Sequence, residues 1–107
     1  MRAGGMADGE YTLGGQKVFK KGIECLLEDG TIAGSVLKLN EGVRNLKEYT
    51  ELSLPEVFAC GSFNPAKAIG EEGRIGSLEV GKCADIIICD EDINVSTTII
   101  DGEVFVS

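Results

Sequence analysis

The sequence predicts an α/β fold in which short strands come first, helices follow, and strands return at the end of the chain. The prediction depends on a hydrophobic fraction of 43% with only two prolines, a one-sided helical pattern in the middle of the chain, and an apolar run near its end. A chain of 107 residues has the length of one domain. It can bury roughly two thirds of its unfolded surface, which is enough for a core.

Glycine-containing turns divide the N-terminal part of the chain into short segments. The turn signals are Asp8-Gly9, Gly14-Gly15, Lys21-Gly22 and Asp29-Gly30. Glycine reaches the positive φ angles that tight reversals need. We therefore expect two or three short antiparallel strands within residues 11–27.

Apolar residues then recur at helical spacing. Steps of four, three, three and three place five of them on one face of a helix: Leu39, Val43, Leu46, Tyr49 and Leu52. Ser53 and Glu56 form a capping box that begins a second helix, with the apolar members Leu54, Val57, Phe58 and Cys60. We expect Asn64-Pro65 to end that helix and to begin a third over residues 66–69, which Gly70 and Gly73 end.

Strand patterns follow Arg74. Residues 84–89 are apolar except for Asp85, as expected of a strand that is buried on both faces. Residues 95–100 and 103–106 flank Asp101-Gly102, which is the pattern of a hairpin. These last strands need a sheet to join and the helices need a surface to cover, so the order is awkward for a self-contained domain.

The charge of the chain excludes several classes of partner. A net charge of -8 and a pI near 4.4 leave no basic stripe to neutralise phosphates, so we expect no nucleic acid. The same charge disfavours an anionic membrane surface. No apolar run approaches the roughly eighteen residues of a membrane span, and residues 1–5 are no secretory signal. We expect a cytoplasmic protein.

Two residue types restrict the chemistry further. The chain contains no histidine, so alone it cannot be a hydrolase that uses a histidine base or histidine-held metal. Its four cysteines are Cys25, Cys60, Cys83 and Cys89. They include no C-x-x-C pair of the kind common at zinc sites, and cytosolic thiols stay reduced. We expect them to be packing residues.

Other candidate residues have structural explanations. Asp8 and Glu10 could form an acid/base pair, but carboxylates beside an Asp-Gly turn are usually solvated. Lys82 and Asp85 are expected to anchor a turn. The serines that we considered as nucleophiles have no histidine partner: Ser35, Ser53 and Ser62. Residues 76–81 are not a phosphate loop, because Cys83 follows Lys82 where serine or threonine is required. We therefore predict no catalytic residue in this chain.

Five motifs, in the correct order, resemble N-acetylglucosamine-6-phosphate deacetylases of the amidohydrolase superfamily. The first four are residues 8–15 (DGEYTLGG), 30–35 (GTIAGS), 42–46 (GVRNL) and 64–70 (NPAKAIG). The fifth, residues 76–87 (GSLEVGKCADII), is similar to a signature found widely near the C-termini of amidohydrolases. The resemblance covers nearly all of this chain but only the C-terminal quarter or so of such an enzyme.

The resemblance implies a (β/α)8 barrel fold. Residues 1–73 would be the C-terminal piece of the barrel, a β-hairpin excursion and the closing helices. Residues 74–107 would be the C-terminal strands of a small composite β-sandwich domain. Lacking the other strands, the chain alone is expected to have open sheet edges and an exposed apolar helix face, and to be marginally stable and oligomeric or aggregation-prone.

The resemblance also implies a substrate contact. In the family, the loop that matches residues 30–35 approaches the bound amino sugar through its backbone, and the matching contact positions are Ile32, Ala33 and Gly34. Considered without the family, Asp29-Gly30 turns a hairpin and Gly34-Ser35 relieves crowding before the helix. The metal ligands of the family are a glutamate and two histidines far upstream. Its catalytic aspartate would align two residues before Met1.

Three hypotheses follow. The first is a fragment, inactive alone, of a deacetylase that releases acetate and glucosamine 6-phosphate by attack of a metal-activated water, with zinc or iron as the metal of the parent. Its partners would be the amino-sugar phosphate and the missing barrel portion or a second copy. The second is a non-catalytic module that binds an amino sugar or pairs with a barrel subunit. The third is a fragment of another amidohydrolase, such as a dihydroorotase-like or imidazolone-hydrolysing enzyme.

Overall fold

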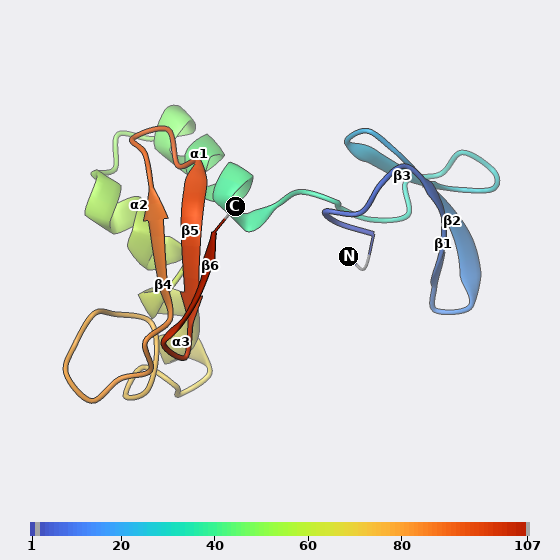
Figure 1. Ribbon diagram of the computed structural model, residues 1–107. Coiled ribbons are helices and arrows are strands. Elements are labelled where there is room, and N and C mark those ends of the chain that lie inside the picture. The colour runs from blue at the N-terminus through green and yellow to red at the C-terminus, as the bar shows by residue number, and fades with distance from the viewer. Residues whose placement is uncertain (2, 107) are drawn as a thin grey trace. The chain divides into compact units, whose positions relative to one another are not determined.

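The computed structural model describes residue 1 and residues 3–106, and these form two compact units, Met1–Lys38 and Leu39–Ser107. Each unit holds one three-stranded antiparallel sheet (Figure 1). The mixed α/β content confirms the predicted fold class. The boundary between the units does not coincide with the predicted division at residues 73/74, which concerns the domains of a parent enzyme and stays a prediction.

The first unit is a sheet with the strand order β1-β2-β3. Its strands are β1 (Gly9–Leu13), β2 (Gln16–Lys21) and β3 (Glu24–Leu27), as the glycine turns predict. Tyr11 pairs with Val18, and Val18 pairs with Leu27, so the three side chains share one face. That face packs on a small core of Ala3, Val18, Cys25 and Val36.

The second unit begins with three helices, α1 (Leu39–Tyr49), α2 (Leu54–Cys60) and α3 (Phe63–Ala68). The predicted capping box is confirmed. Ser53 Oγ accepts from the Glu56 amide at 3.4 Å and Glu56 Oε1 accepts from the Ser53 amide at 3.3 Å. The hydrogen bond from the Ser53 side chain also lowers the pKa of Glu56.

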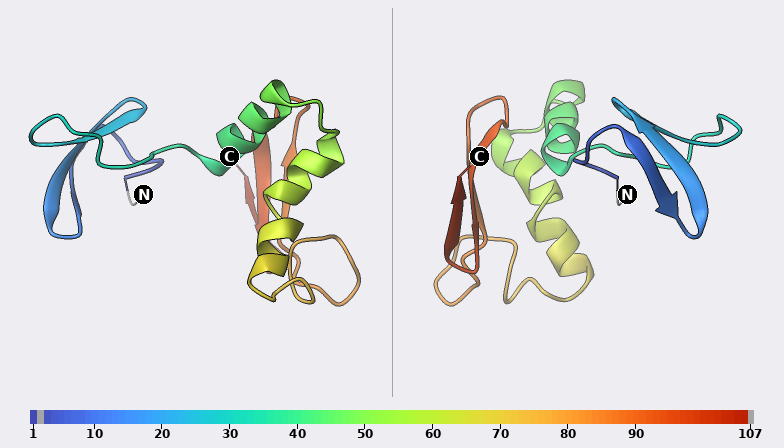
Figure 2. Two further views of the ribbon diagram at one scale, coloured as in Figure 1. Left: turned by 180° about the vertical axis from the view of Figure 1, so that it is seen from behind. Right: turned by 45° about the vertical axis from the view of Figure 1, so that its right-hand side comes forward.

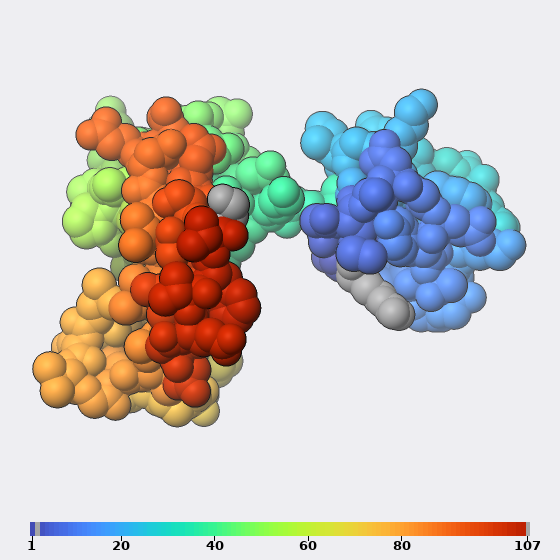
Figure 3. Space-filling model, viewed as in Figure 1, coloured from blue at the N-terminus to red at the C-terminus, as the bar shows by residue number. Residues whose placement is uncertain are grey.

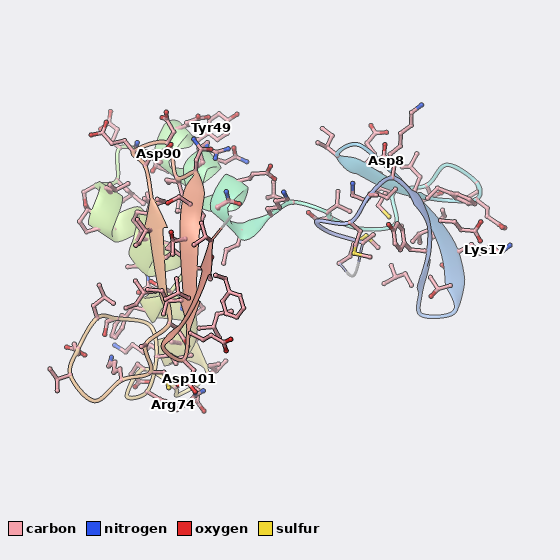
Figure 4. All side chains as sticks on the ribbon, in the orientation of Figure 1. Asp8, Lys17, Tyr49, Arg74, Asp90 and Asp101 are labelled. Atoms are coloured by element: carbon pink, nitrogen blue, oxygen red, sulfur yellow. The ribbon has the colours of Figure 1, made fainter. Side chains whose placement is uncertain are left out.

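One detail of the predicted helices is wrong. Asn64 and Pro65 lie inside α3 rather than between two helices, and Gly61 ends α2. Proline fits there because the amides of the first helical turn have no intrahelical acceptor. The predicted exposed apolar helix face is confirmed on α1: Val43 is buried, whereas Leu39 and Tyr49 are 71% and 82% exposed, and Tyr49 is labelled in Figure 4. The second unit has a small core of Val43, Val57 and Ile93, and of α1 only the middle packs against it, through Val43 and Leu46.

The second sheet has the strand order β4-β5-β6. Its strands are β4 (Ile86–Cys89), β5 (Val95–Ile100) and β6 (Glu103–Val106). The predicted hairpin is confirmed, since Asp101 and Gly102 have φ angles of 49° and 82°, as in the turns that join two-residue hairpins. The helices lie on one side of this sheet (Figure 2).

The prediction that residues 84–89 are buried on both faces is wrong. Ile87 and Ile88 are 44% and 53% exposed. The helices cover only one side of the sheet, and β4 lies at its edge, so neither face of β4 is fully enclosed. The other side of the sheet forms an open surface (Figure 3). Among the described helices, none is long and apolar enough to cross a membrane.

All four cysteines are free thiols, but they are not equally packed. Cys25 is buried, as predicted, and Cys83 and Cys89 are half-buried. Cys60 is exposed, so its predicted packing role is wrong. It is the last residue of α2, beyond the contact that Val57 and Phe58 make with the core.

Candidate functional site

The loop that follows β3 begins with a tight turn. Gly30 has a φ of 84°, and its amide donates to the Leu27 carbonyl at 3.0 Å. Asp29 Oδ1 accepts from the Thr31 amide at 2.9 Å, and this hydrogen bond lowers the pKa of Asp29. Asp29-Gly30 therefore reverses the chain, as turn chemistry alone predicts.

After the turn, the chain runs back along β3. The Leu27 amide donates to the Thr31 carbonyl at 2.7 Å, and the Ala33 amide donates to the Cys25 carbonyl at 2.8 Å. Ile32 forms an antiparallel bridge with Leu26. Backbone groups alternate in direction along an extended strand, so the N–H and C=O of Ile32 point away from β3.

The three predicted contact residues are thus consecutive in a segment that runs beside β3 and touches it through one isolated bridge at Ile32. Ile32 is 77% exposed, whereas Ala33 and Gly34 are half-buried. The Ala33 amide is used within the fold, which leaves the peptide groups of Ile32 and Gly34 as the main-chain groups that can meet a ligand. In the described part of the chain, no backbone hydrogen bond occupies them.

Gly34 is a glycine that the fold does not require. Its φ lies outside the left-handed region, and among the described residues a Cβ there would meet only the Met1 side chain, with Sδ at 3.8 Å and Cε at 4.0 Å. Ser35 is occupied locally, because its Oγ accepts from the Leu37 amide at 3.1 Å. Neither turn geometry nor packing among the described residues requires Gly34, and a glycine here leaves the main chain uncovered by a side chain.

The carboxylates of the first unit hold the sheet together. Asp8 Oδ1 accepts from the Gly22 amide at 2.9 Å and lies 3.4 Å from Lys20 Nζ. The Gly22 amide, followed by Lys20, lowers the pKa of Asp8. Glu10 pairs with Lys17 at 3.6 Å. Asp8 and Glu10 therefore serve separate structural contacts and form no acid/base pair.

Polar residues of the second unit have equally local roles. Lys82 Nζ contacts Ser77 Oγ at 2.7 Å and Glu79 Oε2 at 2.9 Å. Asp85 Oδ1 accepts from the Asp101 amide at 2.8 Å and so anchors the β5–β6 turn, as predicted for a turn-anchoring residue. Ser62 Oγ donates to the Phe58 carbonyl at 2.6 Å.

A polar cluster on α1 is not predicted by any of the motifs. Arg44, Asn40 and Lys47 donate to main-chain carbonyls of residues 91–93. Their spacing of four and three residues on one helix was the available signal. The other half of the contact lies almost fifty residues away in the chain, and the sequence alone does not pair the two.

Among residues 1 and 3–106, the side chains form no group that fits a divalent metal. The chain has no histidine, and in the parts that the structure describes no three side chains among Cys, Asp and Glu are grouped to hold one. We therefore assign no metal-dependent step to residues of this chain.

Comparison with known proteins shows that the chain is similar to part of several amidohydrolases. The model of the Amidohydrolase family matches residues 17–105. The chain is 46% identical to the N-acetylglucosamine-6-phosphate deacetylase of Bacillus subtilis over 97% of its length and 26% of that protein. It is 37% identical to the N-acetylgalactosamine-6-phosphate deacetylase of Escherichia coli O157:H7 over 96% of its length and 27% of the relative.

A solved structure agrees with these relatives. The crystal structure of N-acetylglucosamine-6-phosphate deacetylase from Thermotoga maritima matches 98% of this chain with a TM-score of 0.81 and 40% identity. The match covers 29% of that chain. The sequence thus spans little more than a quarter of the length of these three proteins.

Proposed function

Because the chain belongs to the amidohydrolase family, we propose that it is part of an enzyme that hydrolyses N-acetylglucosamine 6-phosphate to acetate and glucosamine 6-phosphate. The observation that carries the proposal is the 46% identity with such an enzyme across 97% of the chain. The reaction adds water across the amide, so the acetyl carbon leaves as acetate and the nitrogen stays on the sugar as an amine.

Within that enzyme, the chain would supply binding and scaffold. Residues 1–73 would close the (β/α)8 barrel, and residues 74–107 would complete a small β-sandwich. The open surface of the β4–β6 sheet supports this division, because such a sheet needs further strands to cover it. The partner would be the remaining barrel portion, and the location would be the cytoplasm.

The substrate contact would be the segment beside β3 at Ile32, Ala33 and Gly34. The peptide groups of Ile32 and Gly34, which form no backbone hydrogen bond with the described residues, would hydrogen-bond the hydroxyl or acetamido groups of the sugar. The absence of a side chain at Gly34 would let the ring approach. The role of this loop is to bind and orient the sugar, and the zinc or iron of the parent enzyme would be held elsewhere.

A chimeric enzyme tests the proposal. We would replace the matching quarter of the Bacillus subtilis relative with this chain and measure acetate release from N-acetylglucosamine 6-phosphate. We expect retained activity, with Gly34→Val raising KM about tenfold, as expected when a ligand contact of about 1.4 kcal/mol is lost. Gly73→Val is the matched control, because Gly73 lies in open space. A folded but inactive chimera would refute the assignment.

Two measurements on the isolated chain test its catalytic inactivity and its sugar binding separately. With zinc or iron added, we expect no acetate above the rate without protein, and enzyme-like release would overturn the prediction of inactivity. In an NMR titration with the same sugar phosphate, shifts confined to the amides of residues 32–34 would support the loop contact. Saturable binding by a chain whose chimera is inactive would favour the non-catalytic module.

A further inference from the structure

The core of the second unit contains one buried residue from the loop that joins β4 and β5. Ile93, in the loop between β4 and β5, is 1% exposed and belongs to the core cluster of Val43 and Val57. Of the described residues that follow Ala66 in the sequence, Ile93 alone is buried. None of the described strand residues of β4, β5 and β6 is buried to that degree. The loop thus inserts a plug between α1 and α2.

Ile93 holds an unfavourable backbone conformation. Its φ is 62°, in the left-handed region that β-branched residues avoid. Such a conformation persists only when the surroundings impose it. Part of that constraint is Asp90, whose Oδ1 accepts from the amides of Asp92 at 3.0 Å and Asn94 at 2.9 Å.

The rest of the constraint comes from α1. Arg44 Nε donates to the Asp92 carbonyl at 2.6 Å, and its Nη2 donates to Asn94 Oδ1 at 2.9 Å. Asn40 Nδ2 donates to the Ile93 carbonyl at 3.2 Å, and Lys47 Nζ donates to the Glu91 carbonyl at 2.7 Å. A single helix face therefore holds the carbonyls on both sides of the plug.

The Asp90-x-Asp92-x-Asn94 spacing is similar to that of cation-binding loops, but the contacts point to a different role. Both carboxylate oxygens of Asp90 accept hydrogen bonds within the loop, and the side-chain oxygen of Asn94 accepts from Arg44. The positive charge beside the loop is supplied by the guanidinium group.

We infer that residues 90–94 are the joint that fastens the β4–β6 sheet to the α1–α2 pair, with Ile93 as a hydrophobic plug and Arg44 as its latch. The hydrogen bonds of Arg44 offset the backbone strain of Ile93. Burial of Ile93 in turn holds the loop within reach of Arg44. If the proposed division at residues 73/74 is correct, this joint ties the sandwich part to the barrel part of the enzyme. Arg44 is then a positioning residue and not a catalytic one.

A double-mutant cycle on the whole chain tests the inference. The variants are Arg44→Met, Ile93→Ala and the double variant, with urea unfolding of the second unit followed by amide signals of β5. Each single substitution lowers the folding equilibrium constant by some factor. Because plug and latch depend on each other, we expect the factor for the double variant to be at least about threefold smaller than the product of the two single factors. Independent effects that multiply would overturn the joint.

Arg74→Met is the matched control, since Arg74 forms only an exposed ion pair with Glu71 and a weak contact with Cys83 in the described chain. Its effect should multiply with that of Ile93→Ala. If Arg44→Met does not fold, Arg44→Lys with Ile93→Val replaces it in the same cycle, with the same expected coupling. Signals of β1–β3 serve as an internal reference, and an equal loss of stability there would also refute the joint. An inactive chimera leaves this result untouched, so the two proposals fail separately.

Discussion

At the scale of single residues, aspartates close the turns of both units. Asp8, Asp29, Asp85 and Asp90 each accept a backbone amide at 2.8–3.0 Å. Hydrogen bonds to the ionised form of a carboxylate favour that form, and the pKa values of Asp8, Asp29 and Asp90 are lowered by the amides of Gly22, Thr31 and Asn94. Some of the acidic residues of the chain thus have a structural role, which is to hold turns.

Asp90 gives the first prediction. Its pKa is lowered from an ordinary value of 3.8, chiefly by the Asn94 amide. A group with a lower pKa in the folded state stabilises fully above its unfolded pKa and loses that contribution as pH falls through the folded pKa. We therefore expect the stability difference between the wild type and Asp90→Asn to shrink below about pH 4 in urea titrations. Asp92→Asn, whose carboxylate receives no hydrogen bond from the described residues, should show a smaller change, and equal pH profiles would contradict the assignment.

At the scale of elements, turn conformation decides how the strands pair. The β5–β6 hairpin depends on Asp101 and Gly102, both with positive φ. The Asp101 amide is held in addition by Asp85, so the hairpin is tied back to the start of β4 (Figure 4). Both strands pair in a continuous register from Thr97↔Val106 to Ile100↔Glu103.

Two glycines form a matched pair for a test of this turn. A Cβ would meet nothing within 4 Å at either Gly102 or Gly73, but only Gly102 has a left-handed φ, of 82°. We expect Gly102→Ala to destabilise the second unit by about 1 kcal/mol, the cost of placing an L-residue in that region. Gly73→Ala should be neutral or slightly stabilising. Urea unfolding followed by circular dichroism distinguishes the two, and equal effects would show that the turn conformation does not matter.

At the scale of the whole molecule, each unit has its own small core and much apolar surface remains accessible. The core clusters are those of Val18 and of Val57. Ile23 is 93% exposed and Val106 is 80% exposed. An edge strand with apolar residues pairs readily with another chain, and β6 at one edge of the second sheet has four exposed residues.

We therefore expect the isolated chain to associate through β6. In sedimentation velocity, Val106→Lys should raise the concentration at which association appears, because a lysine on an edge strand opposes strand addition. Ile23→Lys is the control, since it changes the net charge of -8 equally but lies between β2 and β3. A wild type that stays monomeric with a cooperative thermal transition would contradict the expectation, as would equal effects of both lysines.

The sequence by itself determined the features that depend on near neighbours in the chain. Glycine turns, the Ser53 capping box and the Asp101-Gly102 hairpin were predictable because their hydrogen bonds join residues a few positions apart. The family of the chain was predictable for a related reason, since ordered motifs in a single chain identify it without a structure. The contact role of Ile32, Ala33 and Gly34 follows from that family and stays a prediction.

Only the tertiary structure decided which apolar residues are enclosed. Leu39 and Tyr49 share the periodicity of Val43 yet remain exposed, and the predicted burial of Ile87 and Ile88 fails, because burial depends on what another segment covers. The left-handed Ile93 and its latch at Arg44 are decided in the same way, by atoms 48–50 residues apart. Local chemistry is encoded at short range, whereas enclosure and strain exist only once distant segments meet.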